Sequence, residues 1–190
     1  MFSSGQRDPG LRRSFHSPLR PGLIDLHGRS DAMAPQFFQV DSKAIVIRSA
    51  RVDEIISLRH RILRAGLPME EAHFDGDGES TTHHVAAFDS EDAICCATFV
   101  LNSWEREPAW QLRGMATDAG WQGKGLGQTV LVYATQLVLE SSLVRLFWCN
   151  ARTPAIEFYR RQGWEARSEQ FEIPTAGPHR KMVKAVGSRQ

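Results

Sequence analysis

The spacing of apolar residues changes several times between residues 44 and 186, and each change marks an expected element of secondary structure. Runs rich in β-branched and aromatic residues, bounded by polar ones, are typical of strands. Seven such runs occur, at residues 44–48, 83–89, 93–104, 109–118, 143–151, 168–173 and 180–186. The second and third runs predict a hairpin, with the fourth as the next strand of the same meander.

Apolar residues recur at the spacing of a helix in three further segments, 52–63, 126–138 and 153–164. In the last of these, we expect Thr153 to cap the N-terminus and Gly163 to end the helix. The resulting order is strand, helix, long loop, three strands, helix, strand, helix and two strands. The sequence therefore predicts a mixed α/β domain.

Residues 1–40 differ from the rest of the chain, because they are rich in Arg, Ser, Pro and Gly and show almost no periodic apolar pattern. Such a segment cannot bury enough apolar surface to fold by itself. We predict a disordered extension over residues 1–40 and one folded domain over residues 41–187. The alternative is that translation starts at Met33, in which case residues 1–32 would not belong to the protein.

Length, composition and charge fit one ordinary globular domain. The chain has 190 residues, of which 42% are hydrophobic, and its formal net charge is +1. A charge so close to neutral gives no field that would hold nucleic acid or an anionic membrane, and no apolar run approaches the roughly 18 residues of a membrane span. We therefore expect neither as a partner, and the assembly is open between a monomer and a homodimer.

The three cysteines predict a reduced, cytoplasmic protein. Cys95 and Cys96 are adjacent and Cys149 stands apart, so no Cys-x-x-Cys pair offers a metal site and no easy disulfide is present. Small buried side chains in strands are the expected role. The histidines 83–84 and the nearby aspartates show no metal-ligand spacing, and we expect no metal.

The segment GWQGKGLGQTVL, residues 120–131, carries three glycines at every second position around one lysine. It is not a P-loop, because Lys124 is followed by Gly125 rather than by Ser or Thr. It is not the dinucleotide fingerprint either, because Gly127 follows Gly125 by two positions instead of three. A helix that begins near Gly125 would point its unpaired amides into this loop, which suits a pyrophosphate. A simple tight turn would explain only one of the glycines.

Two motifs together resemble the GNAT superfamily of N-acetyltransferases. The loop of that family reads Gln/Arg-x-x-Gly-x-Gly/Ala, and residues 122–127 satisfy it. The pattern Phe158-Tyr159-x-x-x-Gly163-Trp164 follows at the distance expected in the family. The resemblance covers about residues 44–186. It implies an α/β fold with a central mixed, mostly antiparallel twisted sheet of six to seven strands, flanked by about four helices.

The resemblance also implies acetyl-CoA as cosubstrate. Its pyrophosphate would meet the glycine loop, and its pantetheine arm would add along a sheet edge that splays from the next strand. One backbone amide, at Met115 or Ala116, would stabilise the oxyanion. The implied cofactor-binding residues are Met115, Ala116, Thr117, Gln122, Gly123, Lys124, Gly125, Leu126, Gly127, Gln128, Asn150, Ala151, Arg152 and Phe158.

Tyr159 occupies the general-acid position of the family. A phenol there could donate a proton to the departing thiolate of CoA, or hold its sulfur by a hydrogen bond. The other tyrosine of the chain, Tyr133, falls in the middle of a predicted helix, where core packing explains it better. Packing is also the alternative role for Tyr159.

The general base stays open at this stage. Many relatives have a glutamate on the strand before the loop, where this chain has Gln111 and Arg113. Imidazole accepts a proton near neutral pH, and the candidates are His60, His84, His179, Glu70 and Glu71. We expect His84, Arg113 and His179 at the acceptor site. Arg113 would either pair with a loop carboxylate such as Asp75 or bind an anionic group of the acceptor.

The predicted activity is transfer of an acetyl group from acetyl-CoA to a primary amine of a small molecule, by direct attack in a ternary complex. An acyl-enzyme is not expected, because nothing in the sequence supplies the low-pKa surroundings that Cys149 would need as a nucleophile. The alternative from another class is a non-catalytic module that binds or senses acyl-CoA, in which Tyr159 only packs.

Overall fold

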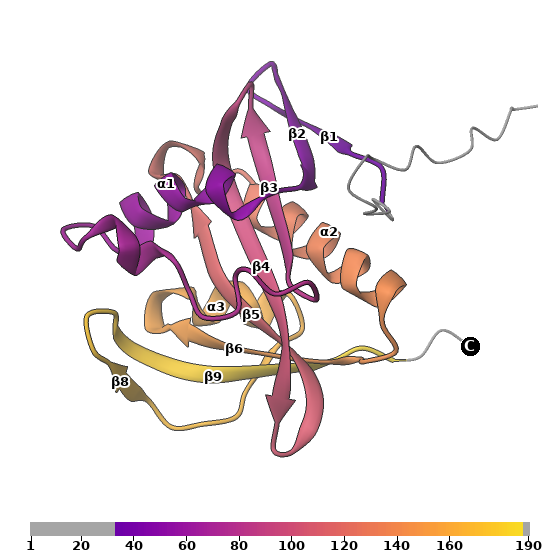
Figure 1. Ribbon diagram of the computed structural model, residues 1–190, viewed down its shortest axis with the longest axis vertical. Coiled ribbons are helices and arrows are strands. Elements are labelled where there is room, and N and C mark those ends of the chain that lie inside the picture. The colour runs from indigo at the N-terminus through magenta and orange to yellow at the C-terminus, as the bar shows by residue number, and fades with distance from the viewer. Residues whose placement is uncertain (1–32, 188–190) are drawn as a thin grey trace, which may run out of the picture. The chain divides into compact units, whose positions relative to one another are not determined.

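A nine-stranded mixed sheet runs through residues 33–187, the part of the chain that the computed structural model describes (Figure 1). The strands follow the order β1-β2-β3-β4-β5-β6-β9-β7, and β8 also pairs with β9. Neighbouring strands are antiparallel except β5 and β6, which are parallel. Their bounds are β1 Gln36–Val40, β2 Lys43–Ser49, β3 His83–Asp89, β4 Asp92–Trp104, β5 Glu107–Thr117, β6 Leu146–Arg152, β7 Glu165–Ala166, β8 Phe171–Ile173 and β9 Gly177–Ala185.

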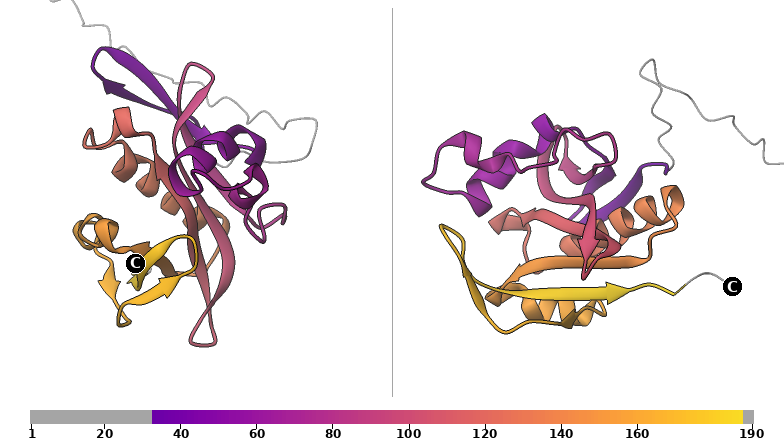
Figure 2. Two further views of the ribbon diagram at one scale, coloured as in Figure 1. Left: turned by 90° about the vertical axis from the view of Figure 1, so that its left-hand side faces the viewer. Right: turned by 60° about the horizontal axis from the view of Figure 1, so that its bottom comes forward.

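Helices cover both faces of this sheet. The α-helices are α1 Val52–Leu63, α2 Leu126–Ser141 and α3 Ile156–Arg161, and the short 3-10 helices are η1 Met69–Ala72, η2 Ala119–Trp121 and η3 Thr153–Ala155. Helices α2 and α3 share the larger apolar core, whereas α1 packs in a smaller one. Because neighbouring strand residues point to opposite faces, Cys95 belongs to the larger core and Cys96 to the smaller. Figure 2 shows α1 and α2 on opposite sides of the strands.

Strands β5 and β6 separate halfway along their length. Their pairing runs from Trp110 opposite Phe147 to Leu112 opposite Cys149, and no later pair follows, although both strands continue. In the same stretch, β5 bulges against β4 at Gly114, which has a φ of +57°. A bulge bends and twists its strand. The second half of β5 therefore has an open edge that faces away from β4.

A buried polar network joins α1 and the long loop to the sheet. Arg59 is fully buried and pairs with Asp77 at 2.6 Å, and it also donates to the hydroxyl of Thr98 at 2.6 Å. The ring of His84 lies between that hydroxyl, at 2.8 Å, and the carbonyl oxygen of Asp77, at 2.9 Å. A carbonyl oxygen can only accept, so Nε2 of His84 carries a proton, and in the neutral tautomer Nδ1 accepts from Thr98. The network fixes the loop over the smaller core.

The structure confirms the mixed, mostly antiparallel sheet and the predicted helices, and it corrects several details. Residues 36–40 form β1, so the prediction of disorder up to residue 40 is wrong for this stretch. The described residues contain nine strands instead of six to seven, and three α-helices instead of about four. Residues 1–32 lie outside the described part, and their disorder and the start at Met33 stay predictions.

The last predicted helix is also organised differently at its N-terminus. Thr153 does not cap it; its hydroxyl donates to the carbonyl oxygen of Pro178 at 3.2 Å. The segment begins as η3, with a proline in the first turn, and only then becomes α3. Gly163 follows the helix with a φ of +78°, as predicted for a C-terminal stop. No helix within residues 33–187 is long and apolar enough to cross a membrane.

Candidate active site

A cleft of about 380 Å³ opens where β5 and β6 separate. Its floor comes from these two strands and α3, and its walls come from the end of α1, the long loop and the β8–β9 turn. The lining residues are Leu63, Arg64, Phe74, Gln111, Leu112, Arg113, Gly114, Met115, Cys149, Asn150, Ala151, Arg152, Ala155, Tyr159, Ile173, Ala176 and His179. Of the residues predicted for the site, seven line this cleft, namely Met115, Asn150, Ala151, Arg152, Tyr159, Arg113 and His179.

The glycine loop leads into α2 through two left-handed residues. Gly123 has a φ of +75°, and Gly125, the N-cap of α2, has a φ of +80°. An L-residue rarely adopts such a conformation, whereas glycine does so at no steric cost. No side chain caps α2, and its first turn contains no acidic residue. The first backbone amides of this 16-residue helix are therefore available to an anion.

The other residues of the loop are held by contacts to the neighbouring elements. The amide of Gln122 donates to the carbonyl oxygen of Thr117 at 3.0 Å. Lys124 pairs with Asp41 at 2.5 Å, which partly neutralises the charge that it could offer to a phosphate. A Cβ on Gly127 would lie 3.5 Å from Met115 and from Thr117, so this glycine packs the start of α2 against β5.

Tyr159 lies at the floor of the cleft, where α3 faces β5. Its hydroxyl donates to the thioether sulfur of Met115 at 3.5 Å, and its ring packs edge-on against Phe158 and Trp164. Only 7% of the residue is exposed. Burial, and then the neighbouring thiol of Cys149, raise the pKa of Tyr159 well above its usual value, so the phenol keeps its proton at neutral pH.

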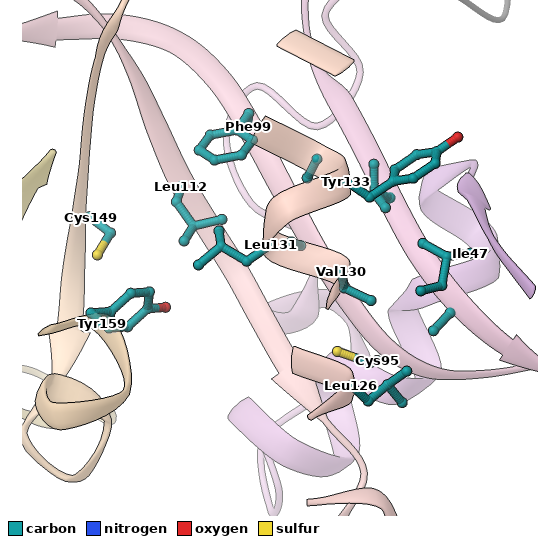
Figure 3. Packing of buried hydrophobic residues seen from close by; sticks show 14 of the residues in the cluster. Ile47, Cys95, Phe99, Leu112, Leu126, Val130, Leu131, Tyr133, Cys149 and Tyr159 are labelled. Carbon is teal, nitrogen blue, oxygen red and sulfur yellow. The ribbon is translucent and has the colours of Figure 1, made fainter. Parts of the chain in front are cut away.

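Cys149 lies beside Tyr159, and Figure 3 shows its sulfur directed toward the tyrosine ring. Burial raises the pKa of this thiol far above its usual value. The thiol form is therefore strongly preferred at neutral pH, and a thiol is a poor nucleophile compared with a thiolate. This environment fits the expectation that Cys149 does not form an acyl-enzyme. Cys95 and Cys96 are also buried and unbridged, and burial raises their pKa values to about 12 and about 11.

The histidine candidates separate into two groups. His179 lines the cleft, and its Nδ1 lies 2.7 Å from the carbonyl oxygen of Gly177. Because that oxygen only accepts, Nδ1 carries a proton, and in the neutral tautomer the lone pair is then on Nε2. His84 is held in the buried network away from the cleft, and His60 contacts the carbonyl oxygen of Leu67 at 2.7 Å outside it.

The remaining polar candidates are placed as follows. Glu70 and Glu71 are exposed in η1 and do not line the cleft. Arg113 lines it and donates to the backbone carbonyl oxygen of Asp75 at 2.5 Å, not to the carboxylate that the sequence suggested as one partner. Gln111 accepts a hydrogen bond from Asn102 at 2.9 Å.

The cleft residues that the sequence analysis missed include Arg64 and Phe74. Arg64 ends α1 and lies 5.0 Å from the ring of Phe74, which belongs to the long loop. Its guanidinium donates to the carbonyl oxygen of Leu63 at 3.0 Å. Burial, and then the charge of Arg152, lower the pKa of Arg64. Only the packing of α1 and of the loop against the sheet brings these residues to the site, so no local motif could have marked them.

The chain belongs to the Acetyltransferase (GNAT) family, and it is an N-acetyltransferase of that family. The family profile matches residues 51–164, which include the glycine loop, strands β5 and β6 of the cleft floor, and Tyr159. A curated relative, the uncharacterised N-acetyltransferase YitI of Bacillus subtilis (strain 168), is 32% identical over 143 residues. The match covers 74% of this chain and 95% of the relative.

Solved structures share the fold at low sequence identity. Escherichia coli ElaA superposes with a TM-score of 0.62 at 14% identity, over 73% of this chain and 98% of that one. An aminoglycoside 6'-N-acetyltransferase complexed with coenzyme A gives a TM-score of 0.59 at 11% identity. The match covers 76% of this chain and 98% of that one. These likenesses establish the GNAT fold. Members of the family use acyl-CoA and transfer the acyl group to an acceptor substrate.

Proposed function

We propose that the protein transfers an acetyl group from acetyl-CoA to a primary amine of a small molecule, by direct attack in a ternary complex. The observation that carries the proposal is the position of Tyr159. Its buried, protonated phenol faces Met115 on the half of β5 that β6 leaves open. Proton donor and open strand edge thus meet at the point where a thioester would have to lie.

The cosubstrate would be bound by backbone groups on both sides of this point. Gln122 to Gln128 would hold the pyrophosphate, since the left-handed glycines expose the first amides of α2. The open edge of β5, from Met115 to Thr117, would pair with the pantetheine arm as an added strand does. Asn150, Ala151 and Phe158 would flank the arm from β6 and α3, together with the backbone of Arg152.

The proposed chemistry needs one proton acceptor and one proton donor. Nε2 of His179 would accept the proton of the attacking amine in the neutral tautomer, in which Nδ1–H donates to the carbonyl oxygen of Gly177. The amine nitrogen would attack the carbonyl carbon of the thioester, and an amide of Met115 or Ala116 would stabilise the oxyanion of the tetrahedral intermediate. The carbonyl would then re-form as the C–S bond breaks. Tyr159 would then donate its proton to the leaving thiolate.

A cytoplasmic location belongs to the same proposal. It rests on the three unbridged cysteines, which suit a reducing compartment.

The proposal is tested by following thiol release from acetyl-CoA with a panel of primary amines. We expect turnover with at least one amine and a stoichiometric amide product identified by mass spectrometry. Binding of acetyl-CoA without turnover of any amine would overturn the proposal and favour a non-catalytic acyl-CoA-binding module. Accumulation of an acetylated protein would contradict direct attack.

A further inference from the structure

Two guanidinium groups converge on one backbone oxygen at the wall of the cleft. Arg64, at the end of α1, and Arg152, at the end of β6, both donate to the carbonyl oxygen of Leu63, at 3.0 and 2.9 Å. Both side chains are half-buried and line the cleft. Two like charges are thus held close together, although Arg152 lies 89 residues after Leu63 in the chain.

No carboxylate of the described residues neutralises this pair. Within residues 33–187, neither arginine forms an ion pair within 4.0 Å. The lining of the cleft contains no aspartate or glutamate, and it contains a third arginine, Arg113. Glu71 acts on Arg64 only at longer range. Half-buried guanidinium groups without a counter-ion raise the free energy of the folded protein. An anion between them would reduce their mutual repulsion and offset the loss of hydration.

The phosphates of the cosubstrate do not fill this role in the proposed binding mode. They belong to residues 122–128, and none of these residues lines the cleft. Arg64 and Arg152 instead line the cleft itself, from the end of α1 and the end of β6. The anion that fits here is therefore part of the acceptor.

We propose that Arg64 and Arg152 bind a carboxylate of the acceptor, so that the substrate class is small amino acids rather than neutral amines or polyamines. Two guanidinium groups present several N–H donors to the two oxygens of a carboxylate. A cleft of about 380 Å³ accommodates a small acceptor beside the acetyl end of the cosubstrate. The choice of substrate class rests on the proposed acetyl transfer. The binding of a carboxylate by the two arginines does not depend on it.

The test uses pairs of an amino acid and its carboxamide, with the amine at the α, β or ω position. The ratio of kcat/KM for carboxylate and carboxamide is measured for the wild type, Arg64→Gln, Arg152→Gln and the control Arg160→Gln. Arg160 is exposed on α3 and pairs with Glu157. We expect the ratio for the preferred pair to fall by roughly 10-fold or more in both cleft variants, as for loss of a charge-assisted hydrogen bond. It should stay unchanged in the control.

Comparing ratios cancels the different reactivities of the two amines. An unchanged ratio in both cleft variants, or a preference for the carboxamide in every pair, would overturn the inference while the acetyl transfer itself stands. Arg64→Lys and Arg152→Lys keep the charge and should retain part of the preference. If the glutamine variants do not fold, the wild type still decides, because added salt should weaken the carboxylate substrate more than its carboxamide.

A calorimetric titration separates this inference from the proposed function. Each member of a pair is titrated into protein saturated with coenzyme A, so that no turnover is needed. If no amine is acetylated but the carboxylate members bind more tightly, and both cleft variants lose this preference, the proposed function fails and the carboxylate site stands. Equal binding of carboxylate and carboxamide would reject the site.

Discussion

The hydroxyl of Tyr159 lies 3.5 Å from the thioether sulfur of Met115, where α3 faces the open half of β5. A thioether is a weak hydrogen-bond acceptor. The phenolic proton is therefore held loosely, and a thiolate arriving at this point would be a far better partner for it. Burial keeps the proton on the phenol until such a partner appears. The contact thus joins the proposed acid to β5, the strand proposed to bind the cosubstrate.

Replacing Gly125 by valine should abolish the binding of acetyl-CoA. The residue has a φ of +80° and caps α2 with its backbone, and a β-branched residue disfavours this conformation strongly. Isothermal calorimetry with acetyl-CoA measures the effect. The matched control is Gly66→Val, which places the same side chain at a φ of +82° with no atom within 4 Å of the new Cβ. Unchanged affinity in Gly125→Val would refute the loop assignment.

Gly114→Ala should destabilise the fold. A Cβ there would lie 2.6 Å from Nε of Arg59, which is buried and paired with Asp77. Strain in the left-handed region and disturbance of a buried ion pair together suggest a loss of about 3 kcal/mol or more in the free energy of unfolding. Urea denaturation measures it. Gly78→Ala, with open space around the new Cβ, should change it little.

Two truncations should have different effects. Deleting residues 1–32 should leave the melting temperature and the affinity for acetyl-CoA unchanged, because that segment offers no periodic apolar face. Deleting residues 1–40 removes β1 and the buried side chain of Val40, and should lower the melting temperature by several degrees. Differential scanning calorimetry compares the two. A large loss with the shorter deletion would show that the segment contributes to the folded state.

Stability in acid should depend on Glu54 in the first turn of α1. Hydrogen bonds from Arg48 and from the backbone amide of Arg51 lower the pKa of its carboxyl, although burial opposes them. Because the folded-state pKa lies below the unfolded one, this stabilisation is present above the unfolded pKa and is lost as the pH falls through the folded pKa.

Glu54→Gln should therefore cost roughly 1 kcal/mol at pH 7, as for loss of a helix cap. It should also flatten the acid side of a plot of melting temperature against pH. The exposed Glu91, in the turn between β3 and β4, provides the control Glu91→Gln. If Glu54→Gln loses stability equally at pH 7 and well below the folded pKa, the loss comes from packing and not from the charge.

The sequence predicted those features of the fold and of the site that depend on the conformation of single residues or short segments. The glycine spacing around Gly125 and the helix stop at Gly163 each reflect a backbone conformation of the residue itself, and the structure has a left-handed residue at both. Strand β1 was missed because its sequence, QFFQV, has little alternation, and its order comes from pairing with β2.

Long-range contacts could not be predicted in this way. Arg59 fits a helical period as though it were apolar, and only the loop residue Asp77 explains its burial. Arg64 and Arg152 lie far apart in the chain, and their side chains meet at the carbonyl oxygen of Leu63. His84 was expected at the acceptor site, but the structure holds it in the network of Arg59 instead. Such placements depend on the assembled sheet.

The most direct test of the proposed mechanism is the single-turnover rate of Tyr159→Phe, measured with saturating acetyl-CoA and a competent amine. Removing the hydroxyl alone should lower this rate by roughly 10²-fold, the range for a positioned acid, while affinity for acetyl-CoA and melting temperature barely change. Single-turnover conditions prevent slow product release from hiding the loss. The matched control is Tyr133→Phe, since Tyr133 is the only other tyrosine of the chain and contacts Met33 and Ala34 away from the cleft. A rate for Tyr159→Phe within a factor of about two of the wild type would contradict the account and leave Tyr159 as a packing residue.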